Sequence, residues 1–265
     1  MLDNSPRIPV PDLRPGIRRP TFFLGIGFPR CGTSWLHHQF THHPMVWVPP
    51  VKELHYWNDQ RDWGIFQKYY LIHLRQMKSM SRFDNRSNEK GRKRFDDYVR
   101  AHGRWALRYF FGSRSLRWYR GLFPEAGYAV CGEITPNYVN MHEGRIAQVL
   151  RFDPAARIIV LLRNPIEQVW SMAAKPFSYN PGRRLAAVPD EVLHRRCLDH
   201  ARNLRYHPPV ARWQRLFGRS QVHIGWYDHI AADKAGFLTG MARHLGVDPH
   251  RSSATGAPWT SVRTS

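Results

Sequence analysis

The 265-residue chain is poor in cysteine, with three scattered positions, Cys31, Cys131 and Cys197. Three cysteines at this spacing are too few for a disulfide framework or a zinc site. The sequence also lacks any apolar run near the ~18 residues that a membrane-spanning helix needs. Residues 1–20 lack the apolar core of a signal peptide. These shortages exclude a disulfide-rich secreted scaffold and predict a cytoplasmic protein without stable membrane insertion.

Acidic residues are scarce as well, with 20 Asp and Glu against 40 Lys and Arg, which gives a formal net charge of +20. Such an excess suits an acidic cofactor, an acidic substrate or a membrane surface, and composition alone does not choose among them. Arginines interleaved with aromatics can bind single-stranded nucleic acid, but no nucleic-acid-binding fingerprint accompanies them. We therefore predict no nucleic-acid partner.

The length fits one large α/β domain with a substantial core. Residues 1–20 carry five prolines and four arginines without periodicity, which indicates a loosely ordered arm. We predict a single domain over residues 21–250, with a helical insertion at 60–123 that contributes to substrate choice. Residues 251–265 form an irregular tail.

The most informative stretch is a glycine loop, residues 27–34, between an apolar run at 22–26 and helical spacing from Trp35 onward. This order predicts a strand, a tight loop and a helix. Such a loop aims several backbone N–H groups, with the helix N-terminus behind them, at one spot and favours a bound phosphate. Within the loop, Cys31 is expected to be more exposed to oxidation than the other cysteines.

The spacing Gly27-x4-Gly32 matches a nucleoside-triphosphate P-loop, in which Lys and Ser/Thr should follow. Thr33 stands at the Lys position, and the cation is Arg30, inside the loop. A P-loop nucleotide kinase also needs an acidic residue after a later strand, where this chain has Arg163. A plain strand-to-helix turn that uses glycine for geometry is the other alternative.

The clearest buried strand covers residues 157–162, a β-branched and leucine run of the kind that parallel sheets contain. Arg163 follows at once, and Asn164 and Pro165 are a good N-cap and first residue for a helix. Ser171 lies on that helix, eight positions after Arg163.

Four segments resemble, in order, motifs of the sulfotransferases that use 3′-phosphoadenosine 5′-phosphosulfate (PAPS), in their bacterial and heparan-sulfotransferase-like branch. They are PRCGTSW at 29–35, KELHYW at 52–57, GEITPNY at 132–138 and RIIVLLRNPIEQVWSM at 157–172. The resemblance implies an α/β fold, a P-loop-like three-layer domain with a central parallel β-sheet flanked by helices. It also implies in-line transfer of a sulfuryl group from PAPS, without a metal, to a hydroxyl or amine of a small-molecule or carbohydrate acceptor.

The resemblance implies a PAPS-binding set in which Trp35 stacks on adenine and Tyr227 lies near it. The full set is Arg30, Cys31, Gly32, Thr33, Ser34, Trp35, Arg163, Ser171 and Tyr227. Arg30 is also implied in catalysis, and Arg163 with Ser171 is implied at the 3′-phosphate.

On the acceptor side the resemblance implies Glu53 as the general base, with His55 in support. In the cytosolic small-molecule branch a His has that role at about this place, so the choice between the two stays open. Thr135 and Tyr138 are implied to border the acceptor site.

Two places depart from the family pattern. Asp228 and His229 replace the usual acidic pair after Tyr227, and residues 251–265 lack the usual order of a late basic loop that covers the 3′-phosphate. A catalytically dead homologue, or a non-catalytic basic protein that binds a glycan or nucleotide, therefore stays open. The sequence does not identify the acceptor or the oligomeric state.

Overall fold

The structure, a computed structural model, describes residues 19–58, 103–178 and 185–250. Predictions for most of the N-terminal arm, for residues 60–102 and for the tail lie outside this described part. Five strands form one sheet in the order β2-β3-β1-β4-β5, and every neighbouring pair is parallel. The strands are β1 (Thr21–Gly25), β2 (Val46–Trp47), β3 (Val130–Ile134), β4 (Arg157–Leu162) and β5 (Val222–Trp226). The parallel sheet confirms the predicted fold class.

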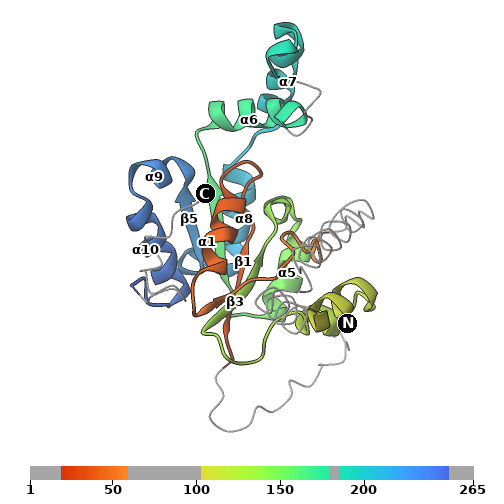
Figure 1. The fold of residues 1–265 in the computed structure, drawn as a ribbon, viewed down its shortest axis with the longest axis vertical. Coiled ribbons are helices and arrows are strands. Elements are labelled where there is room, and N and C mark those ends of the chain that lie inside the picture. Colours follow the sequence, from red (N-terminus) through yellow and green to blue (C-terminus); the bar gives the residue numbers. More distant parts are fainter. Residues whose placement is uncertain (1–18, 59–102, 179–184, 251–265) are drawn as a thin grey trace, which may run out of the picture.

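Helices cover both faces of this sheet, so the fold has three layers (Figure 1). On one face α1 (Thr33–Thr41) meets α10 (Lys234–Leu245) through an edge-to-face contact of Trp35 and Phe237. On the other, α5 (Glu143–Phe152) and α8 (His207–Phe217) are joined by an ion pair of Glu143 and Arg215. The remaining described helices are the helical residues 103–111, α4 (Leu116–Arg120), α6 (Pro165–Ser178), α7 (Asp190–Asn203), α9 (Tyr227–Ala232) and the short η1 (Pro136–Asn140), η2 (Leu185–Ala187) and η3 (Arg219–Gln221).

The sheet supplies the centre of the core. Phe23 and Leu24 of β1 and Ile158 and Val160 of β4 are fully buried, as expected when helices cover both faces. The chain leaves β1 toward β2 on one side and leaves β4 toward β5 on the other. Ligands of open α/β sheets bind beyond the carboxyl ends of the strands at such a switch point.

Two local features differ from what the sequence pattern indicates. Three prolines between residues 175 and 189 favour a loop from Lys175 onward, but α6 continues to Ser178 with Pro176 inside it. One proline removes a single helical hydrogen bond, and the packing of α6 against α7 offsets that loss. Helix α9, at 227–232, was not predicted. Helices α6 and α7 stand away from the sheet in Figure 1.

Among the described helices, none combines the length and the apolar character needed to cross a bilayer.

Candidate active site

The glycine loop extends the β1–β4 pairing past the end of the strand. The N–H of Ile26 donates to Ile159 O at 2.9 Å, and the N–H of Phe28 donates to Leu161 O at 3.1 Å. A Cβ at Gly27 would lie 2.5 Å from the backbone nitrogen of Leu161. Only glycine fits where two backbones approach this closely.

Gly32 closes the loop in the left-handed region, with φ 82°, and is the N-cap of α1. A Cβ here would lie 2.4 Å from Cδ2 of Tyr227, so glycine is required for space as well as for φ. Because the cap residue has no side chain, the N–H groups of Thr33, Ser34 and Trp35 have no side-chain cap at this position. Such an uncapped helix start favours an anion.

Arg30 is held between the loop and α6. Its φ is 67°, which costs a non-glycine residue on the order of 1–3 kcal/mol. Its Nε donates to Ser171 Oγ at 2.8 Å, and Arg163 Nη1 donates to its carbonyl at 3.4 Å. Gln168 Nε2 donates to Pro29 O at 2.8 Å. The structure thus brings the predicted Arg30, Arg163 and Ser171 together, across 141 positions of sequence.

Arg163 occupies the junction between β4 and α6. Its guanidinium donates to Glu167 Oε2 from Nε at 3.1 Å and from Nη2 at 2.9 Å, and it lies over the Tyr227 ring at 4.7 Å. Tyr206 Oη donates to the Arg163 carbonyl at 2.8 Å. The predicted nucleotide residues Arg163 and Tyr227 therefore face each other.

Asn164 caps α6 as predicted, because its Oδ1 accepts from the N–H of Ile166 at 3.0 Å. Asp228 Oδ2 accepts from the N–H of Asn164 at 3.0 Å. This acidic residue, which departs from the family pattern, connects the start of α9 to the start of α6.

Cys31 lies differently from the expectation. Cys31 is fully buried, and burial raises the pKa of its thiol to about 12. The prediction that it is the most oxidisable cysteine is wrong, because Cys197 is the partly exposed one. Trp35 packs its ring edge-to-face on Phe237, with ring centres 5.8 Å apart.

The segment that carries Glu53, residues 51–57 and here called the Glu53 loop, has no regular secondary structure. His37 of α1 bonds to Pro49 O at 3.1 Å, which holds the start of this loop against the first turns of α1. Glu53 and His55 have φ values of 66° and 51°. The three non-glycine residues with positive φ in the described chain are Arg30, Glu53 and His55, the three that the sequence assigned to catalysis.

The Glu53 carboxylate lies between the Lys52 ammonium group and the His55 imidazole. Lys52 Nζ is 2.5 Å from Oε1, and His55 Nε2 is 3.4 Å from Oε2 without the alignment of a hydrogen bond. Burial opposes ionisation, but the interactions with His55 and Lys52 outweigh it and lower the pKa of Glu53 to about 2. The Glu53 side chain is 29% exposed and that of His55 only 4%.

His55 is oriented from its other side. Asn58 Nδ2 lies 3.0 Å from Nδ1 of His55. An amide N–H at that distance donates to Nδ1 and assigns the ring proton of neutral His55 to Nε2, which faces Glu53.

Sequence reasoning missed Glu133, although it lies in the GEITPNY segment. This carboxylate is 1% exposed and accepts four hydrogen bonds. They come from Tyr119 Oη at 2.5 Å, Thr135 Oγ1 at 2.7 Å, Tyr138 Oη at 3.0 Å and the N–H of Leu54 at 3.1 Å. A glutamate inside an otherwise apolar strand was the available signal, because a buried carboxylate needs partners.

Thr135 and Tyr138 are both fully buried, with their hydroxyls directed at Glu133. Their place at the border of an acceptor site stays a prediction. In this conformation they lie beneath the Glu53 loop.

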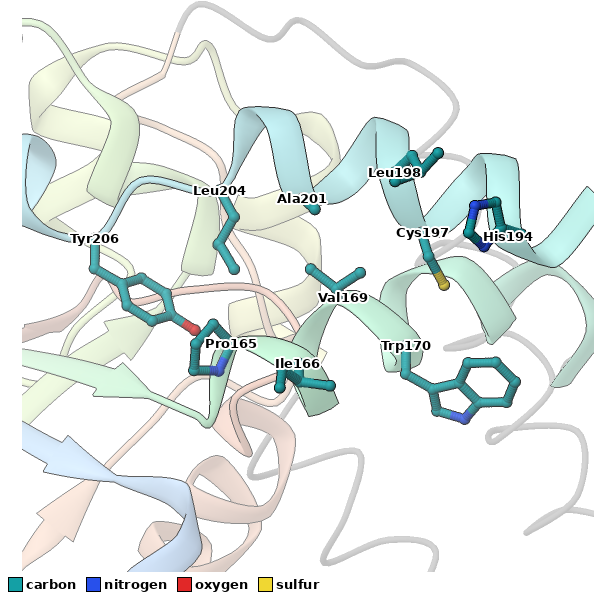
Figure 2. Close-up of a pocket in the computed structure, with 10 residues that line it drawn as sticks. All are labelled: Pro165, Ile166, Val169, Trp170, His194, Cys197, Leu198, Ala201, Leu204 and Tyr206. Atoms are coloured by element: carbon teal, nitrogen blue, oxygen red, sulfur yellow. The ribbon is translucent and has the colours of Figure 1, made fainter.

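The opposite face of α6 is apolar and open. Ile166, Val169 and Trp170 line a groove of about 420 Å³ that α7 closes with Cys197 and Leu198 (Figure 2). Ile166 is 78% exposed and Trp170 is 49% exposed. Residues three and four apart share one face of a helix, whereas Gln168 and Ser171 point the other way, to the glycine loop. The groove therefore lies on the other face of α6 from Arg30, and it adjoins the Arg163 cluster at Tyr206, which lines the groove and donates to the Arg163 carbonyl.

Among the residues that the structure describes, no three His, Cys, Asp or Glu side chains stand together as a metal site requires.

Comparison with solved structures shows the same fold in a sulfotransferase from Alicyclobacillus acidocaldarius. The TM-score is 0.54 at 21% identity, over 94% of this chain and 87% of that chain. The sulfotransferase domain of the Synechococcus PCC 7002 olefin synthase matches with a TM-score of 0.46 at 18% identity, over 89% and 77%. A sulfotransferase from Mycobacterium avium matches with a TM-score of 0.46 at 14% identity, over 88% and 64%.

Comparison with curated protein sequences finds no match. A model of the sulfotransferase family matches residues 20–251, which is most of the chain and includes every described residue except Arg19. The chain belongs to the sulfotransferase family.

Proposed function

We propose that this protein transfers a sulfuryl group from PAPS to a hydroxyl or amine of a small-molecule or carbohydrate acceptor, with Glu53 as general base. The observation that carries the proposal is the meeting of Arg30, Arg163 and Ser171 beside the glycine loop. The site beyond the ends of β1 and β4 therefore contains two guanidinium groups, one hydroxyl and the uncapped N-terminus of α1. This arrangement suits a ligand with two separate anionic groups.

The residues divide between those two groups. The first-turn N–H groups of α1 and Arg30 hold the 5′-phosphosulfate, and Arg163 with Ser171 holds the 3′-phosphate. PAPS, when bound, supplies the activated sulfuryl group. Arg30 balances the negative charge that develops on the leaving oxygen, and its guanidinium presents a fork of donors where a lysine presents a point charge. Trp35 and Tyr227 provide aromatic surface for the adenine.

Glu53 is the better-placed base of the two candidates. Its side chain is 29% exposed and reachable from solvent, whereas the His55 ring is buried behind it. With a pKa of about 2 the carboxylate is ionised at neutral pH and is a weak base. It accepts the acceptor proton late, once sulfuryl transfer has made the hydroxyl acidic. Lys52 and His55 orient it until then.

The nucleotide half of the proposal is tested by calorimetry with 3′-phosphoadenosine 5′-phosphate, the product of the reaction, against AMP and ATP. We expect the bisphosphate to bind much more tightly, because Arg163 and Ser171 form a phosphate site distinct from the loop. Losing one charge-assisted contact typically costs about 1.5–3 kcal/mol. Arg163→Ala should therefore remove most of the difference between the bisphosphate and AMP. Equal affinity for the two nucleotides contradicts the assignment.

The transfer half is tested by mass spectrometry of cell extracts incubated with the protein and labelled PAPS. A labelled sulfated product identifies the acceptor class. Tight bisphosphate binding without any labelled product over a broad acceptor set indicates the non-catalytic homologue. A preference for ATP over the bisphosphate, with phosphorylated product, indicates a kinase.

A further inference from the structure

The Glu53 loop has no regular secondary structure, yet side chains from other segments hold its backbone. Glu133 Oε2 accepts from the N–H of Leu54 at 3.1 Å. Tyr138 Oη accepts from the N–H of Tyr56 at 2.8 Å and from that of Trp57 at 3.3 Å. Three N–H groups of the loop are thus bound by two fully buried side chains of one segment, β3 and the turn after it.

The carbonyls of the loop are held from the other side. Arg114 Nη2 donates to Leu54 O at 3.3 Å and to His55 O at 3.0 Å. The residue between Glu53 and His55 is therefore fixed at both its N–H and its carbonyl. Both neighbours have positive φ, a conformation that persists only when the surroundings over-determine it.

We propose that Glu133, Tyr138 and Arg114 are positioning residues that hold Glu53 in contact with Lys52 and His55. The catalytic meaning of this inference rests on the proposed function, in which Glu53 is the base. The positional part stands on the hydrogen bonds alone. It assigns roles to Glu133 and Arg114, and it gives Tyr138 a role apart from the acceptor contact implied by the family resemblance.

The chemistry of Glu133 fits this role. All four partners can donate, and an ionised carboxylate only accepts, so the four hydrogen bonds favour the charged form of Glu133. They oppose the effect of burial, which raises the pKa of Glu133. Burying a carboxylate in a sheet costs free energy unless hydrogen bonds from its partners offset the loss of hydration. Here the carboxylate connects β3 to the Glu53 loop, a connection that an apolar side chain could not make.

The pKa of Glu53 can be used to measure whether the loop keeps its conformation. The charged or titratable groups that face Glu53 are Lys52 and His55 of the same loop and His37 of α1. If the loop backbone is released, Glu53 and His55 leave their strained positive-φ conformation, and the contacts of the Glu53 carboxylate with Lys52 and His55 lengthen. The pKa of Glu53 then rises from about 2 toward its ordinary value of 4.5.

Tyr119 and Tyr138 form a matched pair for the test. Both are fully buried tyrosines, and both donate to the same oxygen of Glu133, at 2.5 Å and 3.0 Å. Tyr138 also accepts from the backbone of the Glu53 loop, whereas Tyr119 packs its ring on Tyr56 and Trp57, a contact that Tyr119→Phe keeps. Tyr119→Phe and Tyr138→Phe therefore weaken the same carboxylate network, but only the second releases Tyr56 and Trp57.

The experiment is a carbon-13 NMR titration of glutamate carboxylates in the full chain, with the Glu53 signal assigned by its loss in Glu53→Gln. We expect Tyr138→Phe to raise the Glu53 midpoint by about one pH unit or more, and Tyr119→Phe to leave it unchanged. Urea unfolding of both variants separates this shift from general loss of stability. Equal midpoints in the two tyrosine variants overturn the inference, whether or not the protein has sulfotransferase activity.

Arg114 provides a second test that does not depend on a buried substitution, because its side chain is exposed. Arg114→Met should speed hydrogen exchange at the amides of Leu54 and Tyr56 by tenfold or more, whereas Arg117→Met, an exposed arginine on α4, should not. Equal exchange rates in these variants remove Arg114 from the inference.

The catalytic meaning is read from turnover with PAPS and an acceptor found by the labelling experiment. Tyr138→Phe should lower kcat at least tenfold with unchanged affinity for 3′-phosphoadenosine 5′-phosphate, and Tyr119→Phe should leave kcat near the wild-type value. A titration shift in Tyr138→Phe without a fall in kcat keeps the positioning role and rejects Glu53 as the base.

Discussion

The two loops beyond the carboxyl ends of the strands are held in different ways. At Arg30 the glycine loop is held by Arg163 and Ser171, which are half-buried and are proposed to contact the ligand. The Glu53 loop is fixed mainly by Glu133 and Tyr138, which are fully buried. Under the proposed function, the shape of the first loop is therefore coupled to nucleotide binding, whereas the shape of the second is set by the core.

This difference predicts separable effects. Substitutions around the glycine loop should change nucleotide affinity, because the residues that hold the loop are also those proposed to hold the phosphates. Substitutions around the Glu53 loop should change turnover and leave nucleotide affinity nearly constant. The following four predictions test that division, from the largest expected effect to the smallest.

Glu53→Gln keeps the shape of the side chain and removes its basicity. A positioned general base is typically worth about 10²–10⁴-fold in rate, so kcat should fall in that range. Calorimetry should show nearly unchanged affinity for 3′-phosphoadenosine 5′-phosphate. His55→Ala should cost less. A mild Glu53→Gln together with an inactive His55→Ala reverses the two roles.

Glu53 should also make stability depend on pH. Its pKa in the folded protein lies below the ordinary 4.5, so the stabilisation is present above pH 4.5 and is lost as the pH falls toward 2. The full shift corresponds to at most about 3 kcal/mol. Urea unfolding at pH 5 and pH 3 should show a larger loss in the wild type than in Glu53→Gln. Equal losses indicate that Lys52 and His55 do not stabilise the ionised carboxylate.

Arg30→Ala should slow transfer more than it weakens binding of the bisphosphate product. The proposed reason is that Arg30 faces the bridging oxygen, where charge develops in the transition state and which the product no longer shares with sulfur. A lost charge-assisted contact is worth about 1.5–3 kcal/mol. Single-turnover kinetics and product calorimetry measure the two effects. Unchanged turnover with reduced product affinity contradicts this role.

Neighbouring positions on α6 offer the finest comparison. Ser171→Ala removes a hydroxyl that contacts Arg30, and should weaken bisphosphate binding by about 0.5–1.5 kcal/mol. Ile166→Ala changes a side chain that is 78% exposed on the opposite face, and should leave bisphosphate affinity unchanged. Equal losses in calorimetry show that the two faces of α6 are not independent.

The sequence predicts best what depends on neighbouring residues. β1, the glycine loop, β4 and the Asn164 cap each follow from a few adjacent residues, and the structure confirms them. The Glu133 network was missed because Leu54 and Tyr119 reach it from 79 and 14 positions away. Burial of Cys31 likewise depends on packing around the loop, which local pattern does not contain.

The central position of β1 has a consequence for folding. This strand lies between β3 and β4, with Thr21 paired to Val130 and Phe23 paired to Arg157. The ribosome synthesises β3 and β4 long after β1. During translation the apolar residues of β1 and both of its hydrogen-bonding edges are therefore unpaired. Sheets with such distant pairings form slowly and expose unpaired edges meanwhile. Added chaperone that covers β1 until its neighbours are synthesised should therefore raise the yield of correctly folded protein.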